Sequence, residues 1–161
     1  MRLKTIVPED FTNYKVPSMF IGTVACDGKC CKEAGIPVTV CQNHGWLSSQ
    51  THVVSDRELC QRYLGNPITK AVVFGGLEPF EQYHELCRFL NMFREVFGCD
   101  DDVVIYTGFN KDEIKDEVEH LAQYKNIIIK FGRFKPNEQP HFDEVLGVNL
   151  ASSNQYGERI S

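Results

Sequence analysis

Short, continuously apolar segments alternate with amphipathic helical segments along most of this chain, and this alternation restricts the possible fold more than any other feature. Parallel strands read as continuous apolar runs because both faces of their sheet are covered. The candidate strands are residues 19–24, 71–74, 103–106, 127–131 and 145–150. We therefore predict an α/β fold with a mostly parallel sheet and flanking helices.

Three predicted helices separate these strands. The first begins at Ser55, which forms a capping-box pattern with Glu58. The second spans about 80–97, where apolar residues recur at helical spacing. The third begins at Asn110 and has Glu113 in the place of a second capping box. Strands joined by helices of this length imply right-handed crossovers, which bring the carboxyl ends of the strands to one edge of the sheet.

The composition fits one domain spanning residues 1–161. The chain is 42% hydrophobic, which is enough for a core without disulfides, and its net charge of −5 argues against a broad nucleic-acid surface. It contains no apolar run of about eighteen residues and no signal-peptide pattern at its first residues. We expect a cytoplasmic protein with no membrane or nucleic-acid partner.

The seven cysteines are not spaced like a disulfide framework, and a cytosolic protein would keep them reduced. Cys60 and Cys87 lie in helical patterns and are expected to be small core residues. Cys99 stands in a turn and receives no role. The other four cysteines lie within sixteen residues, at Cys26, Cys30, Cys31 and Cys41. This cluster predicts metal or iron–sulfur binding.

Cys26 and Cys30, spaced C-x3-C on a loop that contains glycine, would provide two ligands. The third is Cys41 or Cys31, and Cys41 is favoured because the side chains of adjacent cysteines diverge. A cluster held by three cysteines leaves one iron open to a substrate. Zinc is the alternative, with Cys26, Cys30, Cys41 and His44 as its ligands.

A second motif, Gly75-Gly76-Leu77-Glu78-Pro79, directly follows the candidate strand 71–74. Glycines allow a ligand to approach the backbone closely, and a carboxylate at a strand end can accept hydrogen bonds from an ammonium group. The plainer interpretation is a strand-to-helix turn in which Pro79 begins the helix.

Together, the two motifs resemble those of the radical S-adenosylmethionine enzymes. Within that superfamily the chain most resembles the activating protein of anaerobic ribonucleoside-triphosphate reductase. Three further stretches carry the resemblance in the expected order: Cys41-Gln42-Asn43, Ile105-Tyr106-Thr107-Gly108-Phe109 and Ala151-Ser152-Ser153-Asn154-Gln155.

The resemblance implies a partial, open TIM-like barrel and two cofactors, a [4Fe–4S] cluster and S-adenosylmethionine. Gly75, Gly76 and Glu78 match the motif that binds the methionyl amine, while Tyr106 and Asn154 would line the nucleoside or the approach of the partner. The implied reaction cleaves S-adenosylmethionine reductively and leaves a glycyl radical on anaerobic ribonucleotide reductase. The implied partners are that reductase and a flavodoxin-type or other electron donor.

The chain departs from the family's pattern at two places. The usual spacing is C-x3-C-x2-C, and Glu33 stands where the third cysteine is expected. A later Asp-Gly-x-Phe segment has Phe131 in place of its acidic residue. Two alternatives therefore stay open: a small radical S-adenosylmethionine enzyme that acts on a peptide or small molecule, and a non-catalytic zinc-stabilised binding domain.

Overall fold

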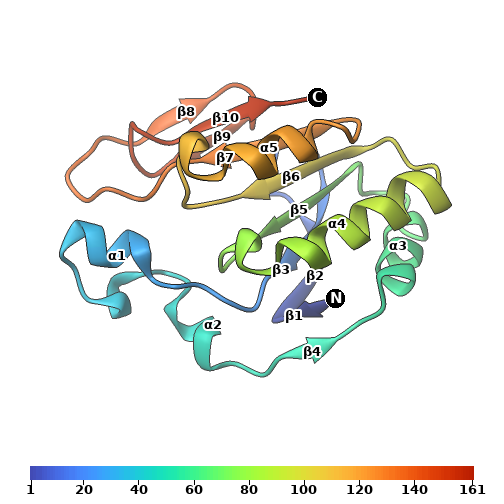
Figure 1. Cartoon of the computed structure of the whole chain (residues 1–161), viewed down its shortest axis with the longest axis horizontal. Coiled ribbons are helices and arrows are strands. Elements are labelled where there is room, and N and C mark those ends of the chain that lie inside the picture. The colour runs from blue at the N-terminus through green and yellow to red at the C-terminus, as the bar shows by residue number, and fades with distance from the viewer.

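A computed structural model describes residues 1–161 and builds them around a six-stranded sheet (Figure 1). Its strands are β2 (Thr5–Asp10), β3 (Ser18–Gly22), β5 (Ala71–Gly75), β6 (Asp102–Tyr106), β7 (Ile127–Phe131) and β10 (Tyr156–Arg159). They lie in the order β10-β7-β6-β5-β3-β2. Two small antiparallel pairs complete the β structure: β1 (Arg2–Leu3) with β4 (His52–Val53), and β8 (His141–Asp143) with β9 (Val148–Leu150).

The centre of the sheet is parallel, as predicted. Strands β3, β5, β6 and β7 pair in parallel with their neighbours, and each contains or overlaps one of the first four predicted strands. The edge strands β2 and β10 pair antiparallel and were not predicted. The sheet is open between these two edges, so the strands do not close into a barrel. Of the expected architecture, the structure shows an α/β fold with a mixed, mostly parallel sheet and flanking helices.

The predicted strand 145–150 is wrong as a member of this sheet. Only β9 is extended, and it pairs with β8 in a separate hairpin. The Asp143 carboxylate accepts a hydrogen bond from the Leu146 backbone N–H at 2.9 Å, and the Gly147 N–H donates to the Asp143 carbonyl at 2.7 Å. Gly147 adopts a φ of 71°, which glycine tolerates without strain. The apolar run is therefore interrupted by the turn of the hairpin.

Most of the helical structure falls where it was predicted. The α-helices are α1 (Lys29–Ala34), α2 (His44–Ser48), α3 (Asp56–Leu64), α4 (Tyr83–Asn91) and α5 (Lys115–Leu121). The 3₁₀ helices are η1 (Val38–Val40), η2 (Pro79–Gln82) and η4 (Lys111–Ile114), and η3 (Met92–Val96) is a π-helical turn. The predicted helix 80–97 is thus the succession η2, α4 and η3.

The two predicted capping boxes differ in outcome. Asn110 and Glu113 satisfy each other's backbone donors, as expected. Ser55 accepts a hydrogen bond from the Glu58 N–H at 3.1 Å, which caps α3. The return bond from the Glu58 side chain does not form, because its carboxylate pairs with Arg62 at 2.6 Å, one turn further along the helix.

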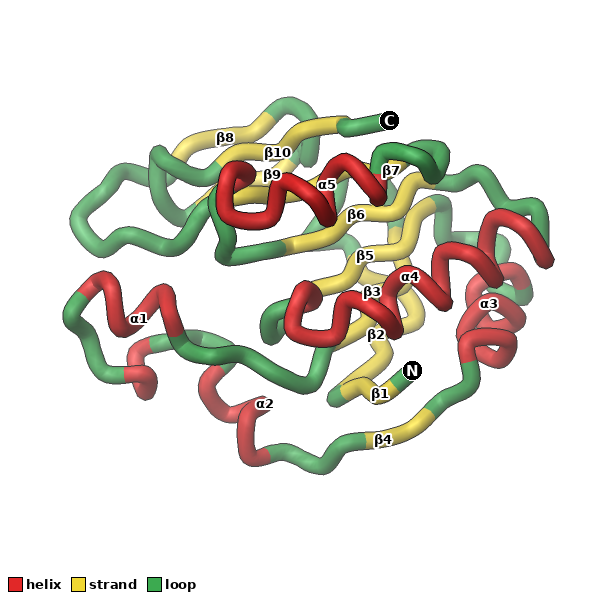
Figure 2. The backbone as a smooth tube through the Cα atoms, viewed as in Figure 1, coloured by secondary structure: helices red, strands yellow, loops and turns green.

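The two faces of the sheet are covered differently. Helices α3, α4 and α5 pack on one face and bury a large apolar cluster with the alternate residues of the central strands (Figure 2). The other face carries a smaller cluster around Phe20, Val73 and Val104. The loop at Tyr14, the hairpin turn at Leu146 and Trp46 of the short helix α2 pack on this second face.

None of the helices is long and apolar enough to cross a bilayer.

Candidate cluster-binding site

The cysteine loop leaves the sheet at the end of β3 and is fixed before it reaches Cys26. Thr23 donates to the Gly75 carbonyl through its backbone N–H at 2.9 Å and its hydroxyl at 3.1 Å. The Val24 N–H donates to the Gln82 side chain at 2.8 Å, and the Glu78 N–H donates to the Ala25 carbonyl at 2.8 Å. The start of the cysteine loop and the turn after β5 are therefore joined, as expected for two loops at one edge of a parallel sheet.

Cys26 and Cys30 line the same pocket at this edge. The rest of its lining comes from four different segments: Asp27, Lys29, Glu78, Gly108, Phe109 and Arg133. The Cys30 sulfur packs so closely on Gly108 that a Cβ there would lie 2.8 Å from it. The Gly28 N–H points at the Cys26 sulfur at 3.4 Å, and Gly28 reaches this position with a φ of 70°. The structure thus brings together the two cysteines of the C-x3-C motif.

Both pocket thiols are held in the neutral form. Burial raises the pKa of Cys26, and burial together with the nearby Cys26 raises the pKa of Cys30 to about 11. Metal ligands must be deprotonated, so loading a metal or cluster at these thiols releases protons.

The third ligand is not brought into the pocket. Cys31 is buried in α1, Cys41 is exposed after η1, and neither lines the pocket. No three cysteine, histidine, aspartate or glutamate side chains converge in a geometry that could hold a metal ion. This includes His44, whose Nδ1 is buried without a hydrogen-bond partner. The choice between Cys41 and Cys31 stays a prediction.

Glu78 is a buried carboxylate whose oxygens are already well used. Its Oε1 accepts hydrogen bonds from the Thr107 hydroxyl at 2.8 Å and the Phe80 N–H at 3.1 Å, and its Oε2 accepts from the Gly108 N–H at 2.9 Å. Burial raises the pKa of Glu78, and these three hydrogen bonds oppose that rise. Glu78 therefore ties the turn after β5 to the turn after β6 and also faces the two cysteines.

The glycines of the turn after β5 allow another group to approach the backbone closely, and in this structure that group is the indole of Trp46. A Cβ at Gly76 would lie 1.9 Å from the indole ring, and a Cβ at Gly22 would lie 3.0 Å from it. Gly75 faces the rings of Phe20 and Tyr106 instead. The indole comes from α2, just after Cys41, and covers the glycine backbone that was predicted to approach a ligand.

The other two predicted cofactor residues lie outside the pocket. Tyr106 points to the second face of the sheet, where its hydroxyl donates to the Asn13 carbonyl at 2.5 Å and burial raises its pKa. Asn154 donates from its side-chain amide to the Arg133 carbonyl at 2.9 Å. The Oδ1 of Asn154 is buried and has no hydrogen-bond partner.

Two basic residues near the cysteines were not predicted as site residues. Lys130 is buried at the end of β7 and donates to the Gly132 carbonyl at 2.7 Å. Burial lowers its pKa to about 8, against the opposing charges of Cys30 and Glu78. A lone lysine in the buried run Ile127–Phe131 was the signal that could have found it.

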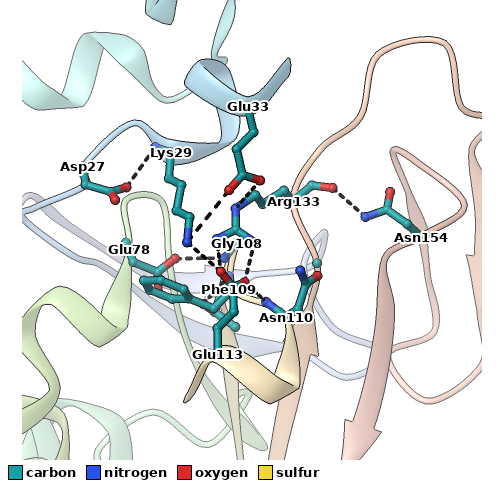
Figure 3. Close-up of polar contacts among 12 residues, drawn as sticks. Asp27, Lys29, Glu33, Glu78, Gly108, Phe109, Asn110, Glu113, Arg133 and Asn154 are labelled. Atoms are coloured by element: carbon teal, nitrogen blue, oxygen red, sulfur yellow. Dashed lines mark hydrogen bonds and ion pairs between the residues drawn. The ribbon is translucent and has the colours of Figure 1, made fainter. Parts of the chain in front are cut away.

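The second residue, Arg133, binds carboxylates from two segments (Figure 3). It makes a bidentate pair with Glu113, with nitrogen–oxygen distances of 2.5 and 2.7 Å, and an ion pair with Glu33 at 3.2 Å. Lys29 also pairs with Glu113, at 2.6 Å. The Arg133 side chain is only 6% exposed, so these charges are partly withdrawn from solvent.

Comparison with protein families identifies the class of site. The model of the 4Fe-4S single cluster domain matches residues 24–156, which include all four clustered cysteines, Glu78 and Asn154. The chain belongs to this family. No curated protein and no solved structure matches it.

Membership of this family agrees with the donor chemistry of the site. Thiolates are the ligands of iron–sulfur clusters, and two cysteines already line the pocket. The third thiolate would have to come from Cys31 or Cys41 through a shift of the surrounding segment. The thiols therefore fit a [4Fe–4S] cluster after that shift, and the family match favours iron–sulfur binding over zinc.

Proposed function

We propose that this protein is a radical S-adenosylmethionine activase that generates a glycyl radical on anaerobic ribonucleotide reductase. The observation that carries the proposal is the shared pocket: Cys26 and Cys30 of the C-x3-C motif lie beside Glu78 of the glycine–glutamate motif. These motifs are far apart in the sequence, and the radical S-adenosylmethionine enzymes that the chain resembles use both for one substrate.

The residues of the pocket have distinct proposed roles. Cys26, Cys30 and Cys41, with Cys31 as the alternative, would hold the cluster, which when bound and reduced supplies one electron to cleave the sulfonium of S-adenosylmethionine. The negative charge of Glu78 would attract the methionyl ammonium group. Because Glu78 is held by three donors from fixed turns, it would be oriented before the substrate arrives.

The glycine turn and the tail would bind the rest of the substrate. Gly75 and Gly76 offer backbone without side chains, and Trp46, which covers Gly76, would have to move or share that surface. The Oδ1 of Asn154 is buried outside the pocket, so it would have to become exposed to accept a hydrogen bond from the nucleoside. Tyr106 lies on the other face of the sheet, so its role would be to support Gly75, whose added Cβ would lie 3.3 Å from that of Tyr106.

The test is reductive cleavage. Protein reconstituted anaerobically with iron and sulfide is mixed with S-adenosylmethionine and a strong reductant, and 5′-deoxyadenosine is measured. We expect its formation to depend on both the cluster and the reductant. Cluster-loaded protein that forms none would overturn the proposal.

The length of the segment from Cys26 to Cys41 favours a second candidate, a small radical S-adenosylmethionine enzyme that acts on a peptide or small molecule. Between Cys26 and Cys41 the chain carries α1 and η1, and α2 directly after Cys41 places Trp46 over the glycine turn, so the access to the site would differ from that of a short C-x3-C-x2-C loop. Electron paramagnetic resonance separates the two candidates. A glycyl radical on the host's anaerobic reductase, formed only with this protein, supports the activase, and its absence despite S-adenosylmethionine cleavage favours the second candidate.

A further inference from the structure

Arg133 connects the helix that carries Cys30 to two other segments at the edge of the sheet. From the cysteine helix α1 it receives Glu33, from the start of η4 it receives Glu113, and its own carbonyl receives the Asn154 amide from the C-terminal tail (Figure 3). Its guanidinium also lies 5.7 Å from the centre of the Phe109 ring. The Arg133 side chain is therefore held in one orientation by Glu33, Glu113 and Phe109.

The link to α1 acts one turn from a cysteine. Glu33 follows Cys30 by three residues, and residues three apart lie on one face of a helix. The carbon chain of Arg133 lies beside the same Gly108 against which the Cys30 sulfur packs. Fixing Glu33 therefore fixes the face of α1 that presents Cys30 to the pocket.

The bidentate pair gives this link its geometry. Arg133 binds both oxygens of Glu113, and Glu113 is itself held by the Asn110 N–H at 2.8 Å and by Lys29 at 2.6 Å. Glu113 thus completes the capping box of η4 and also anchors Arg133. Since a planar guanidinium pairs with a carboxylate in a fixed orientation, Arg133 cannot be replaced by lysine without loss of that orientation.

We propose that Arg133 is a positioning residue for the cluster, holding Cys30 through Glu33 and raising the reduction potential of the cluster with its positive charge. The proposal rests on Cys30 as a cluster ligand, which belongs to the proposed function. A nearby positive charge favours the reduced, more negative form of a cluster, and net charge is one of the factors that set cluster potentials. Glu33, in the place of the family's third cysteine, acts as the counter-charge that draws α1 onto Arg133.

Three variants separate charge from position. Arg133→Gln removes the charge and the bidentate pair, and we expect a more negative midpoint potential and loss of the cluster to a chelator about tenfold faster than in the wild type. Glu33→Gln removes the counter-charge, and we expect a less negative potential. Arg133→Lys keeps the charge, and we expect a potential near that of the wild type together with faster cluster loss.

The potentials are measured by redox titration followed by electron paramagnetic resonance. Lys111→Gln is the matched control, because it removes one positive charge from an exposed ion pair with Glu158 that does not line the pocket. Hydrogen exchange of the metal-free protein adds a readout that needs no cluster: α1 should exchange faster in Arg133→Gln than in Lys111→Gln.

Two results would overturn the proposal. One is a potential for Arg133→Gln equal to that of Lys111→Gln. The other is a shift of the midpoint potential in the same direction for Arg133→Gln and Glu33→Gln. If the two substitutions only loosened α1, both would shift the potential in the same direction, whereas an effect of charge shifts it in opposite directions. If Arg133→Gln does not fold, Glu33→Gln and Arg133→Lys decide the question. A wild-type protein that cleaves no S-adenosylmethionine but shows the opposite shifts contradicts the proposed function and leaves the role of Arg133 intact.

Discussion

The indole of Trp46 lies directly against the backbone of Gly76, so that a Cβ added to this glycine would be 1.9 Å from a ring carbon. Trp46 belongs to α2, which begins three residues after Cys41, and Gly76 belongs to the turn after β5. The contact therefore joins the helix that follows the clustered cysteines to the glycine–glutamate motif, and the chain has no other tryptophan.

Gly76→Ala should destabilise the metal-free protein by about 2–4 kcal/mol, because it adds a clash with Trp46 to the strain of a φ of 83°. Denaturant unfolding measures the change. Gly35→Ala is the control, since Gly35 has a φ of 64° but no neighbour within 4 Å, and it should cost only about 1–2 kcal/mol. Equal costs in the two variants, or a Gly76→Ala cost that Trp46→Ala does not reduce, would show that the contact does not matter.

Glu78→Gln should weaken the binding of S-adenosylmethionine about tenfold or more while leaving the iron content unchanged. The substitution removes the negative charge that faces the pocket, and charge-assisted hydrogen bonds are about twice as strong as neutral ones. Anaerobic equilibrium dialysis measures the affinity. Glu81→Gln, on the exposed side of η2, should bind as the wild type does. Unchanged binding by Glu78→Gln would remove this residue from the ligand site.

Cys41→Ala should abolish cluster assembly, whereas Cys31→Ala should spare it. The physical reason is that Cys31 follows Cys30 directly on α1 and is buried away from the pocket, while Cys41 is exposed on a separate turn. Iron and acid-labile sulfide are counted after anaerobic reconstitution, because free thiolates oxidise readily. Cys60→Ala in α3 is the control for loss of a buried thiol. The reverse result would make Cys31 the ligand.

Acid should weaken the metal-free protein through Glu113. Its hydrogen bonds with Arg133 hold the pKa of Glu113 far below the ordinary value of about 4.3. A carboxyl with a depressed pKa stabilises the fold above its unfolded pKa and loses this contribution as the pH falls through its folded pKa. The contribution at pH 7 is about 1–2 kcal/mol, since the Glu113 side chain is partly exposed.

Glu113→Gln should therefore be less stable than the wild type at neutral pH, and the gap should narrow below about pH 4. Urea unfolding at several pH values measures it. Glu119→Gln, whose ion pair with Lys115 is exposed at 3.7 Å, should show no such gap. A gap for Glu113→Gln that stays constant with pH would mean that the pair with Arg133 does not stabilise the fold.

The parallel core could be predicted because its signals are local. Each central strand contains at least three consecutive apolar residues, and the capping box of Asn110 and Glu113 marks a helix start within four residues. The strand 145–150 was wrong because the Asp143–Gly147 turn competes with the apolar pattern, and the pattern alone does not register it. The edge strands β2 and β10 are partly exposed and carry polar residues, so they lack the apolar run that marks a buried strand.

The site was predictable to the extent that each motif lies within a few residues. Cys26, Cys30 and Glu78 share a pocket, as two loops at one edge of the sheet suggested. Arg133 and Trp46 were missed because their partners are distant in sequence: Glu33 is a hundred residues before Arg133, and Gly76 is thirty after Trp46. Such contacts depend on how α1 and α2 pack against the edge of the sheet, which a single sequence does not reveal.

The most direct test of the account is the electron paramagnetic resonance spectrum of the reduced, cluster-loaded protein with and without S-adenosylmethionine. The proposed activase requires a [4Fe–4S] cluster with three cysteine ligands and one open iron beside Glu78. We expect S-adenosylmethionine to change the g values of the cluster signal. The Glu78→Gln variant should need an S-adenosylmethionine concentration at least about tenfold higher for the same change. A reduced-cluster spectrum that stays the same at saturating S-adenosylmethionine would contradict the account.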